Sequence, residues 1–485
     1  MLRSLRRVVA PLMTLLTLAV TLSGFPGIAE AQAISQREVT FTNDDVTLAG
    51  TLVLPEGNGP FAAVAILHGA GPETRQPYRP DAAMLARAGI AALIYDKRGT
   101  GTSSGDWQTA SLDDLIADGL AAVHFLQQQP EIAPDQVGIL GSSQGAWLAP
   151  FAAARDESVA FFVQVTGAAT PLANQEMWDD GNSLAALGFS ERAIEAAMKA
   201  QHLLYSARPL IRRGILPLGD LWFVHYDPYL DPADAWPQVR VPALVLYGGR
   251  DPTVPGRTSL ETVQGFLADG GHPSSRIAVF PDAGHALGGP SRNDDPAYRA
   301  LVTSWIPSVA RGEPVPEMPA SVEDIPAEPL RWYGIGALHT PWYATAGVQL
   351  GLILGFLLIS LLAVVLSLMP GARLRLPGLR LVPRLVLGLA GAVNLVLVAS
   401  LLLVINYLLN ADASSASPTV PLSKVLPLLS LLSLVLALAL AYVAFRAWRG
   451  RTWSGVVRVL YTLVTLAALG FVPFLAYWHL LGGRL

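Results

Sequence analysis

The sequence predicts an α/β domain with a mostly parallel sheet, followed by an all-α region that crosses a membrane. Over the first 310 residues, short apolar runs alternate with helical patterns, and four much longer apolar stretches follow. The mean hydropathy is +0.42 and only 14% of the 485 residues are charged. A chain of this length and apolarity is too long for one ordinary domain and too apolar to lie wholly in water.

Seven apolar runs predict the strands. Near-continuous apolar runs separated by helices are typical of parallel strands that are buried on both faces. The expected strands are 46–54, 62–67, 91–95, 137–140, 161–165, 243–247 and 276–280.

Two local signals predict further elements. Residues 39–54 contain Asn43-Asp44-Asp45 in their middle, which favours an antiparallel hairpin at the edge of the sheet. Ser111 is followed three residues later by Asp114 and then by apolar residues at helical spacing. This pattern predicts a helix with a capping box at its start.

About 75 residues separate the strands 161–165 and 243–247, whereas roughly 2 to 6 residues are enough to join a strand to its helix. The extra residues are helical in pattern and rich in aromatic side chains. We interpret residues 166–240 as a helical cap over a pocket. An added helical layer with no part in binding is the alternative.

The N-terminus has the pattern of an export signal. Three arginines (Arg3, Arg6 and Arg7) precede an apolar stretch, and small residues follow near position 31. We expect a signal peptide over residues 1–33, cleaved after Ala31 or Ala33. An uncleaved signal anchor is the alternative.

The C-terminal third of the chain has the composition of a membrane region. A Pro- and Glu-rich linker is expected over residues 311–341, between the α/β domain at 38–310 and a membrane domain at 342–485. Each of four apolar stretches has the roughly 20 residues that cross a bilayer. The expected spans are 344–368, 385–409, 425–445 and 459–481.

Charges in the loops predict the orientation of these spans. The first and third loops are rich in arginine, whereas the second, residues 410–424, has one Asp and one Lys. Arginine-rich loops face the cytoplasm. The domain at 38–310 is therefore expected on the periplasmic or extracellular side, which is also where an export signal would send it.

The span interiors contain no Asp, Glu, Lys or Arg, and ion pathways through a membrane usually need such groups. We therefore expect an anchor or assembly bundle rather than a transporter. Asn394 and Asn406 are candidates for hydrogen bonds between the helices.

Composition also excludes several kinds of site and partner. With no cysteine, the chain has no thiol nucleophile, no disulfide and no cysteine metal site. The net charge is −4 and the first 340 residues contain no basic tract, so nucleic acid is not expected as a partner.

The strongest chemical signal is Gly141-Ser142-Ser143-Gln144-Gly145, between the strand 137–140 and an apolar helical run. A serine nucleophile on a sharp turn from strand to helix needs small residues on both sides. The start of the following helix also favours negative charge at the site. Ser143 is therefore the candidate nucleophile.

A serine hydroxyl needs a base to accept its proton and a carboxylate to orient that base. His285 follows the last expected strand, and Asp251 follows the strand before it. The chain order Ser143, Asp251, His285 predicts a catalytic triad. Asp282, three residues before the histidine, is the alternative carboxylate.

A glycine-bearing turn, His68-Gly69-Ala70-Gly71-Pro72, follows the strand 62–67. Such a turn can present a backbone N–H to the oxyanion of a tetrahedral intermediate. We assign the two expected N–H donors to Ala70 and Gln144.

These segments, together with Tyr95-Asp96-Lys97-Arg98-Gly99, resemble those of the α/β-hydrolase superfamily, among them bacterial carboxylesterases, dienelactone hydrolases and serine aminopeptidases. The resemblance covers residues 39–309. It implies the α/β-hydrolase fold with a mostly parallel eight-stranded sheet, an acyl-enzyme mechanism with the triad above, and mainly structural roles for Asp96 and Arg98. It implies no metal or other cofactor.

The leading hypothesis is a membrane-tethered serine hydrolase that cleaves small-molecule or lipid carboxylic esters. A peptidase, in which cap carboxylates such as Glu176 bind a substrate amine, or an acyltransferase would use the same triad. A binding or membrane-assembly module without catalysis is the alternative from another class.

Overall fold

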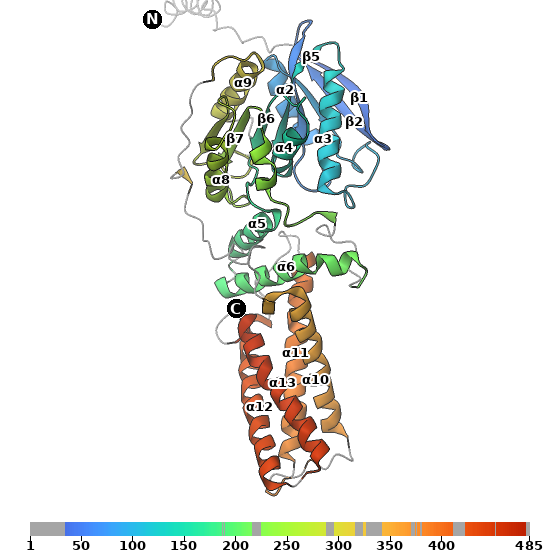
Figure 1. Cartoon of the computed structure of the whole chain (residues 1–485), viewed down its shortest axis with the longest axis vertical. Coiled ribbons are helices and arrows are strands. Elements are labelled where there is room, and N and C mark those ends of the chain that lie inside the picture. Colours follow the sequence, from blue (N-terminus) through green and yellow to red (C-terminus); the bar gives the residue numbers. More distant parts are fainter. Residues whose placement is uncertain are drawn as a thin grey trace, which may run out of the picture.

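The computed structural model describes residues 34–186, 188, 190–215, 225–287, 295–315, 324–325, 342–369, 374, 376–378, 381–410, 422–451 and 453–481. The expected signal peptide, most of the expected linker and the side chain of Asn406 lie outside the described residues. Three parts follow one another along the long axis of the molecule: a sheet with its flanking helices, the helices α5 and α6, and a bundle of long helices (Figure 1).

The sheet has eight strands in the order β1-β2-β4-β3-β5-β6-β7-β8. Their bounds are β1 (Ser35–Asn43), β2 (Val46–Leu54), β3 (Phe61–Leu67), β4 (Ala91–Tyr95), β5 (Ile132–Ser142), β6 (Phe162–Val165), β7 (Ala243–Gly248) and β8 (Arg276–Phe280). β2 pairs antiparallel with both β1 and β4, and the remaining pairs are parallel. The mostly parallel sheet and its antiparallel edge hairpin are thus confirmed.

Strand β5 is longer than the sequence predicts. It begins at Ile132, five residues before the apolar run at 137–140, and its pairing with β3 shifts register between Phe61 and Ala63. The irregular pairing admits the polar residues Asp135 and Gln136 into the strand. Apolar periodicity alone could therefore not locate this end of the strand.

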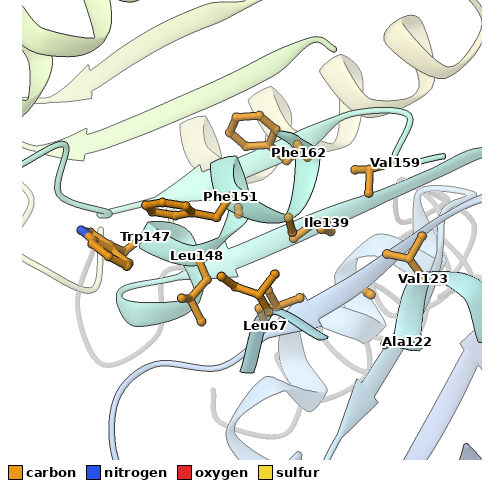
Figure 2. Packing of buried hydrophobic residues seen from close by; sticks show 14 of the residues in the cluster. Leu67, Ala122, Val123, Ile139, Trp147, Leu148, Phe151, Val159 and Phe162 are labelled. Carbon is orange, nitrogen blue, oxygen red and sulfur yellow. The ribbon is translucent and has the colours of Figure 1, made fainter. Parts of the chain in front are cut away.

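Helices cover both faces of the sheet. Helices α3 (Leu112–Gln127), α4 (Gln144–Arg155) and α8 (Gly256–Ala268) pack into one apolar cluster, and α2 (Arg79–Arg87) and α9 (Pro296–Ala310) into another. Figure 2 shows part of the first cluster, in which Trp147, Leu148 and Phe151 of α4 lie among side chains of the strands and of α3. This packing holds the start of α4 against the end of β5.

The predicted capping box of α3 is present. The Ser111 hydroxyl accepts a hydrogen bond from the Asp114 N–H (3.1 Å), and the Asp114 carboxylate accepts one from the Ser111 N–H (2.7 Å). Two of the N–H groups that a helix start leaves unpaired are satisfied in this way.

The insertion between β6 and β7 contains α5 (Leu172–Ala186) and α6 (Glu191–Arg212), with short 3-10 turns η2 (Pro232–Asp234) and η3 (Trp236–Gln238). Figure 1 shows α5 and α6 between the sheet and the bundle. Buried side chains of α6, including Leu203 and Tyr205, share an apolar cluster with the bundle helices. The insertion therefore joins the two halves of the molecule.

Four helices form the bundle: α10 (Ala346–Leu368), α11 (Val382–Asn410), α12 (Leu422–Gly450) and α13 (Gly455–Tyr477). All four are long and apolar enough to cross a membrane. Asn394 of α11 accepts a hydrogen bond from the Ser433 hydroxyl of α12 (2.6 Å), so this asparagine does link two helices.

Two short 3-10 turns elsewhere, η1 (Gln76–Tyr78) and η8 (Trp342–Ala344), complete the described elements.

The expected last span, 459–481, extends too far, because α13 ends at Tyr477. His479 lies beyond the helix, with its Nε2 2.9 Å from a Glu195 carboxylate oxygen and 2.5 Å from the Lys199 ammonium of α6. The histidine therefore lies in a polar cluster with two side chains of the cap helix α6, and not within a membrane-spanning helix.

Candidate active site

Ser143 lies on a tight turn between β5 and α4. Its φ of 52° and ψ of −114° are unusual for a residue with a side chain, and such strain is held only by the surrounding structure. The Ser143 N–H donates to the Val165 carbonyl (3.0 Å), and its carbonyl accepts from the Trp147 N–H (3.0 Å). Strand β6 and the first turn of α4 therefore fix the position of the hydroxyl.

The two glycines of the motif are required by close backbone approaches. A Cβ on Gly141 would lie 2.2 Å from the Gly145 carbonyl oxygen, and one on Gly145 would lie 2.4 Å from the Leu67 carbonyl oxygen. Both obstacles are backbone atoms, which cannot move aside as a flexible side chain can. The small residues that the motif predicts thus have a direct steric reason.

The structure brings Ser143, His285 and Asp251 together from three separate segments. The Ser143 hydroxyl oxygen lies 3.0 Å from His285 Nε2, and His285 Nδ1 lies 2.9 Å from Asp251 Oδ2. Both distances are those of hydrogen bonds. Asp251 is buried, whereas the His285 side chain is 29% exposed and Ser143 is half-buried.

The second oxygen of Asp251 is also held. Its Oδ1 accepts hydrogen bonds from the N–H groups of Thr253 (2.8 Å) and Val254 (3.1 Å), in the loop between β7 and α8. Asp282 points elsewhere: it pairs with Arg250 at 2.6 Å, and its side chain is 87% exposed. The geometry favours Asp251 over Asp282 as the partner of His285.

The turn after β3 is pinned on several sides. The Gly69 N–H donates to the Tyr78 hydroxyl (2.8 Å) and to the Glu73 carboxylate (3.2 Å). His68 contacts the Tyr95 carbonyl through Nε2, and burial lowers its pKa to about 3, so the imidazole is uncharged and donates this hydrogen bond. The turn therefore holds Ala70 in place while its N–H has no acceptor within the described part of the chain.

Asp96 and Arg98 make the contacts expected of structural residues. Asp96 accepts hydrogen bonds from the backbone N–H groups of Arg75 and Thr102, both at 3.0 Å. Arg98 forms a bidentate pair with buried Asp118, at 2.7 and 2.8 Å. These contacts tie the loop after β4 to the turn after β3 and to helix α3.

Sequence reasoning missed three side chains near the site. Lys97 is buried and donates to backbone carbonyls of the turn after β3. Asp179 of α5 forms a side-chain hydrogen bond with Thr253, and burial raises the pKa of this carboxyl group. Tyr226 forms a side-chain hydrogen bond with Gln144. Lys97 belongs to a segment that resembles α/β-hydrolases, and Tyr226 is one of the aromatic residues of the expected cap, but no local pattern indicates the contacts that they make.

An eight-stranded, mostly parallel sheet with a serine on a tight turn after a central strand defines the α/β-hydrolase class of proteins. Comparison with known families agrees, because the profile of the alpha/beta hydrolase family matches residues 64–300. This part of the chain belongs to the alpha/beta hydrolase family.

This chain matches only about 60% of the length of the two curated relatives described next. The chain is 30% identical to esterase EstD of Thermotoga maritima over 275 residues, which are 54% of this chain and 62% of EstD. It is 33% identical to thiohydrolase aneE of Aspergillus aculeatus over 38% of this chain and 58% of that protein. Among solved structures, esterase Pf2001 of Pyrococcus furiosus matches with a TM-score of 0.42 and 19% identity, covering 57% of this chain and 92% of that one.

Among the described residues, no group of three or more His, Cys, Asp or Glu side chains could hold a metal ion.

Proposed function

We propose that this protein is a membrane-tethered serine hydrolase that cleaves carboxylic esters through an acyl-enzyme. The observation that best supports this proposal is the unbroken line of contacts from the Ser143 hydroxyl through His285 to Asp251. An ester fits the site because its hydrolysis needs only a nucleophile, a base and an oxyanion site, and the relative EstD is an esterase.

The geometry suggests the following steps. Ser143 Oγ attacks the ester carbonyl while His285 Nε2 takes its proton, and Asp251 stabilises the resulting imidazolium. The N–H groups of Ala70 and Gln144 stabilise the oxyanion, and His285 then protonates the departing alcohol. Water, activated by the same histidine, releases the acid and restores the serine.

The arrangement of the parts supports tethering to a membrane. The four apolar helices have the length of spans, and Figure 1 shows that the cap lies between the sheet and one end of the bundle. Arg384, Arg446 and Arg458 lie at helix ends remote from the cap, as expected if the hydrolase domain is on the outer side. A lipid ester reaching the site from the bilayer would meet the cap first.

An activity-based probe tests the proposal. A fluorophosphonate phosphonylates an activated serine with loss of fluoride, so we expect labelling of the membrane protein on the peptide that contains Ser143, together with release of free acid from short-chain and lipid esters. An absence of labelling and of ester turnover in folded protein would favour the non-catalytic module. Transfer of the acyl group to an added acceptor, in place of free acid, would favour an acyltransferase.

A peptidase for substrates with a free amino group is the second candidate. Three carboxylates, Glu176, Asp179 and Asp180, follow one another on α5, the cap helix that bonds with the Asp251 loop. Burial raises the pKa of Glu176 to about 8, and no Lys or Arg forms a salt bridge with it within the described chain. A substrate ammonium group would supply the missing positive charge.

Substitution of this carboxylate separates the two functions. If a substrate amine binds here, Glu176→Gln should lower kcat/KM for aminoacyl arylamides by roughly 10- to 100-fold, the usual effect of losing a charged hydrogen bond. Turnover of uncharged aryl esters should stay within about twofold. Equal losses on both substrates would exclude an amine-binding role, and absence of arylamide turnover in the wild type would remove the peptidase candidate.

A further inference from the structure

We propose that Lys97 is a positioning residue for the oxyanion site: its ammonium group holds and polarises the peptide group whose N–H, that of Ala70, is expected to bind the oxyanion. This inference rests on the proposed function of Ser143. It assigns a role to the lysine between the two structural residues Asp96 and Arg98.

Three hydrogen bonds support the assignment. Lys97 Nζ donates to the carbonyl oxygens of Gly69 (2.5 Å) and Gly71 (2.9 Å) and to Gln144 Oε1 (3.2 Å). The lysine is only 4% exposed and projects from the end of β4, across the turn after β3. One buried ammonium thus contacts the expected donor Gln144 and the two residues on either side of the other expected donor, Ala70.

The contact with Gly69 matters because of peptide connectivity. The Gly69 carbonyl and the Ala70 N–H belong to the same planar peptide group. A cation bound to the carbonyl oxygen draws electron density toward that oxygen and leaves the N–H more positive. Chains of hydrogen bonds strengthen one another in this way, by about 10–30% per neutral bond, and charge-assisted bonds are stronger still.

The Gln144 contact acts on the second donor. The backbone N–H of Gln144 belongs to the first residue of α4, and its side chain is bonded by Lys97 on one side and Tyr226 on the other. Both expected donors are therefore linked to one cation. Other groups, including Tyr78, Glu73 and His68, also hold the turn, so removal of the charge need not unfold it.

The surroundings make the charge of Lys97 sensitive to pH. Burial lowers its pKa to about 8, against the opposing effect of the Glu73 carboxylate. A small cavity beside it is also lined by His68, which is uncharged above pH 4, and by Asp118, whose charge is paired with Arg98. As pH rises through 8, the ammonium becomes neutral and its hold on the Gly69 carbonyl weakens.

The test compares kcat and KM from pH 6 to 10 in full-length Lys97→Met and Lys97→Gln proteins. Loss of one oxyanion donor lowers kcat by about 10²–10³-fold in other hydrolases, so weakening a donor should cost roughly 10- to 100-fold at pH 7. KM should change less than about threefold, because the oxyanion forms only in the transition state. The wild type should lose kcat above pH 8, and the variants should lack this alkaline decline.

Arg98→Met is the matched control, since it removes the adjacent buried cation without touching the turn's carbonyls. It should lower the melting temperature but leave kcat per folded molecule within about threefold, with the alkaline decline still present and moved to higher pH, because the unpaired Asp118 carboxylate favours the charged form of Lys97. Lys97 variants that keep the wild-type kcat would overturn the role of Lys97. If neither Lys97 variant folds, a wild-type kcat that stays level from pH 8 to 10 would overturn it as well.

A parallel Ser143→Ala measurement separates this inference from the proposed function. Hydrolysis that survives in Ser143→Ala refutes the site itself. Loss in Ser143→Ala with full activity in both Lys97 variants refutes only the part played by Lys97.

Discussion

Ser143→Ala should lower kcat for ester hydrolysis by about 10⁴- to 10⁶-fold, with little change in KM for a small aryl ester. Without the hydroxyl no acyl-enzyme can form, and only the oxyanion donors and substrate binding remain to assist attack by water. Single-turnover assays with purified protein in detergent or bilayer discs would measure the loss.

The control is Ser158→Ala, an exposed serine after α4 whose contacts, with Asp156 and Gln127, involve no residue of the candidate site. It should retain full activity and probe labelling. Both variants should melt near the wild-type temperature, so that lost activity is not lost fold. A Ser143→Ala protein with more than a tenth of wild-type turnover would mean that the esterase chemistry takes place elsewhere.

Asp251→Asn should lower kcat by about 10⁴-fold through the tautomer of His285. The N–H groups of Thr253 and Val254 already point at Oδ1, so the amide oxygen of an asparagine takes that place. Its NH₂ group then faces His285 Nδ1, where Oδ2 lies in the wild type. The imidazole must accept this bond at Nδ1 and carry its proton on Nε2, which can no longer take the serine's proton.

Asp282→Asn tests the alternative carboxylate. The Asp282 side chain is exposed and paired with Arg250, so its loss should change kcat by less than about twofold. The pH dependence of kcat for both variants against an aryl ester provides the comparison. Should Asp282→Asn prove the more damaging of the two, the orienting role belongs to that residue.

Much of the fold was predictable because it depends on local patterns. The apolar runs located strands β2 to β8 directly. Strand β1 followed from the hairpin signal around Asn43. The capping box at Ser111 depends only on residues three apart. The end of β5 was not predictable, because its irregular register depends on the neighbouring strand β3.

The polar cluster at His479 shows a different limit. Glu195 and Lys199 are more than 270 residues away in the chain, and nothing in the apolar pattern of the last helix indicates that its end meets α6. The same holds for Lys97, whose carbonyl partners belong to a turn 26 and 28 residues earlier. Hydropathy and motif spacing contain no information on such distances.

By itself, the sequence determined the class of fold, the four span-length helices and the serine between two glycines, because each depends on periodicity or on crowding among near neighbours. Only the tertiary structure placed His285 3.0 Å from Ser143, 142 residues away, and showed that Asp251 contacts this histidine whereas Asp282 pairs with Arg250. It also revealed that buried Lys97 donates hydrogen bonds to two carbonyls of the turn after β3. The order and packing of the strands bring these groups together, and that order is set by contacts distributed over the whole sheet.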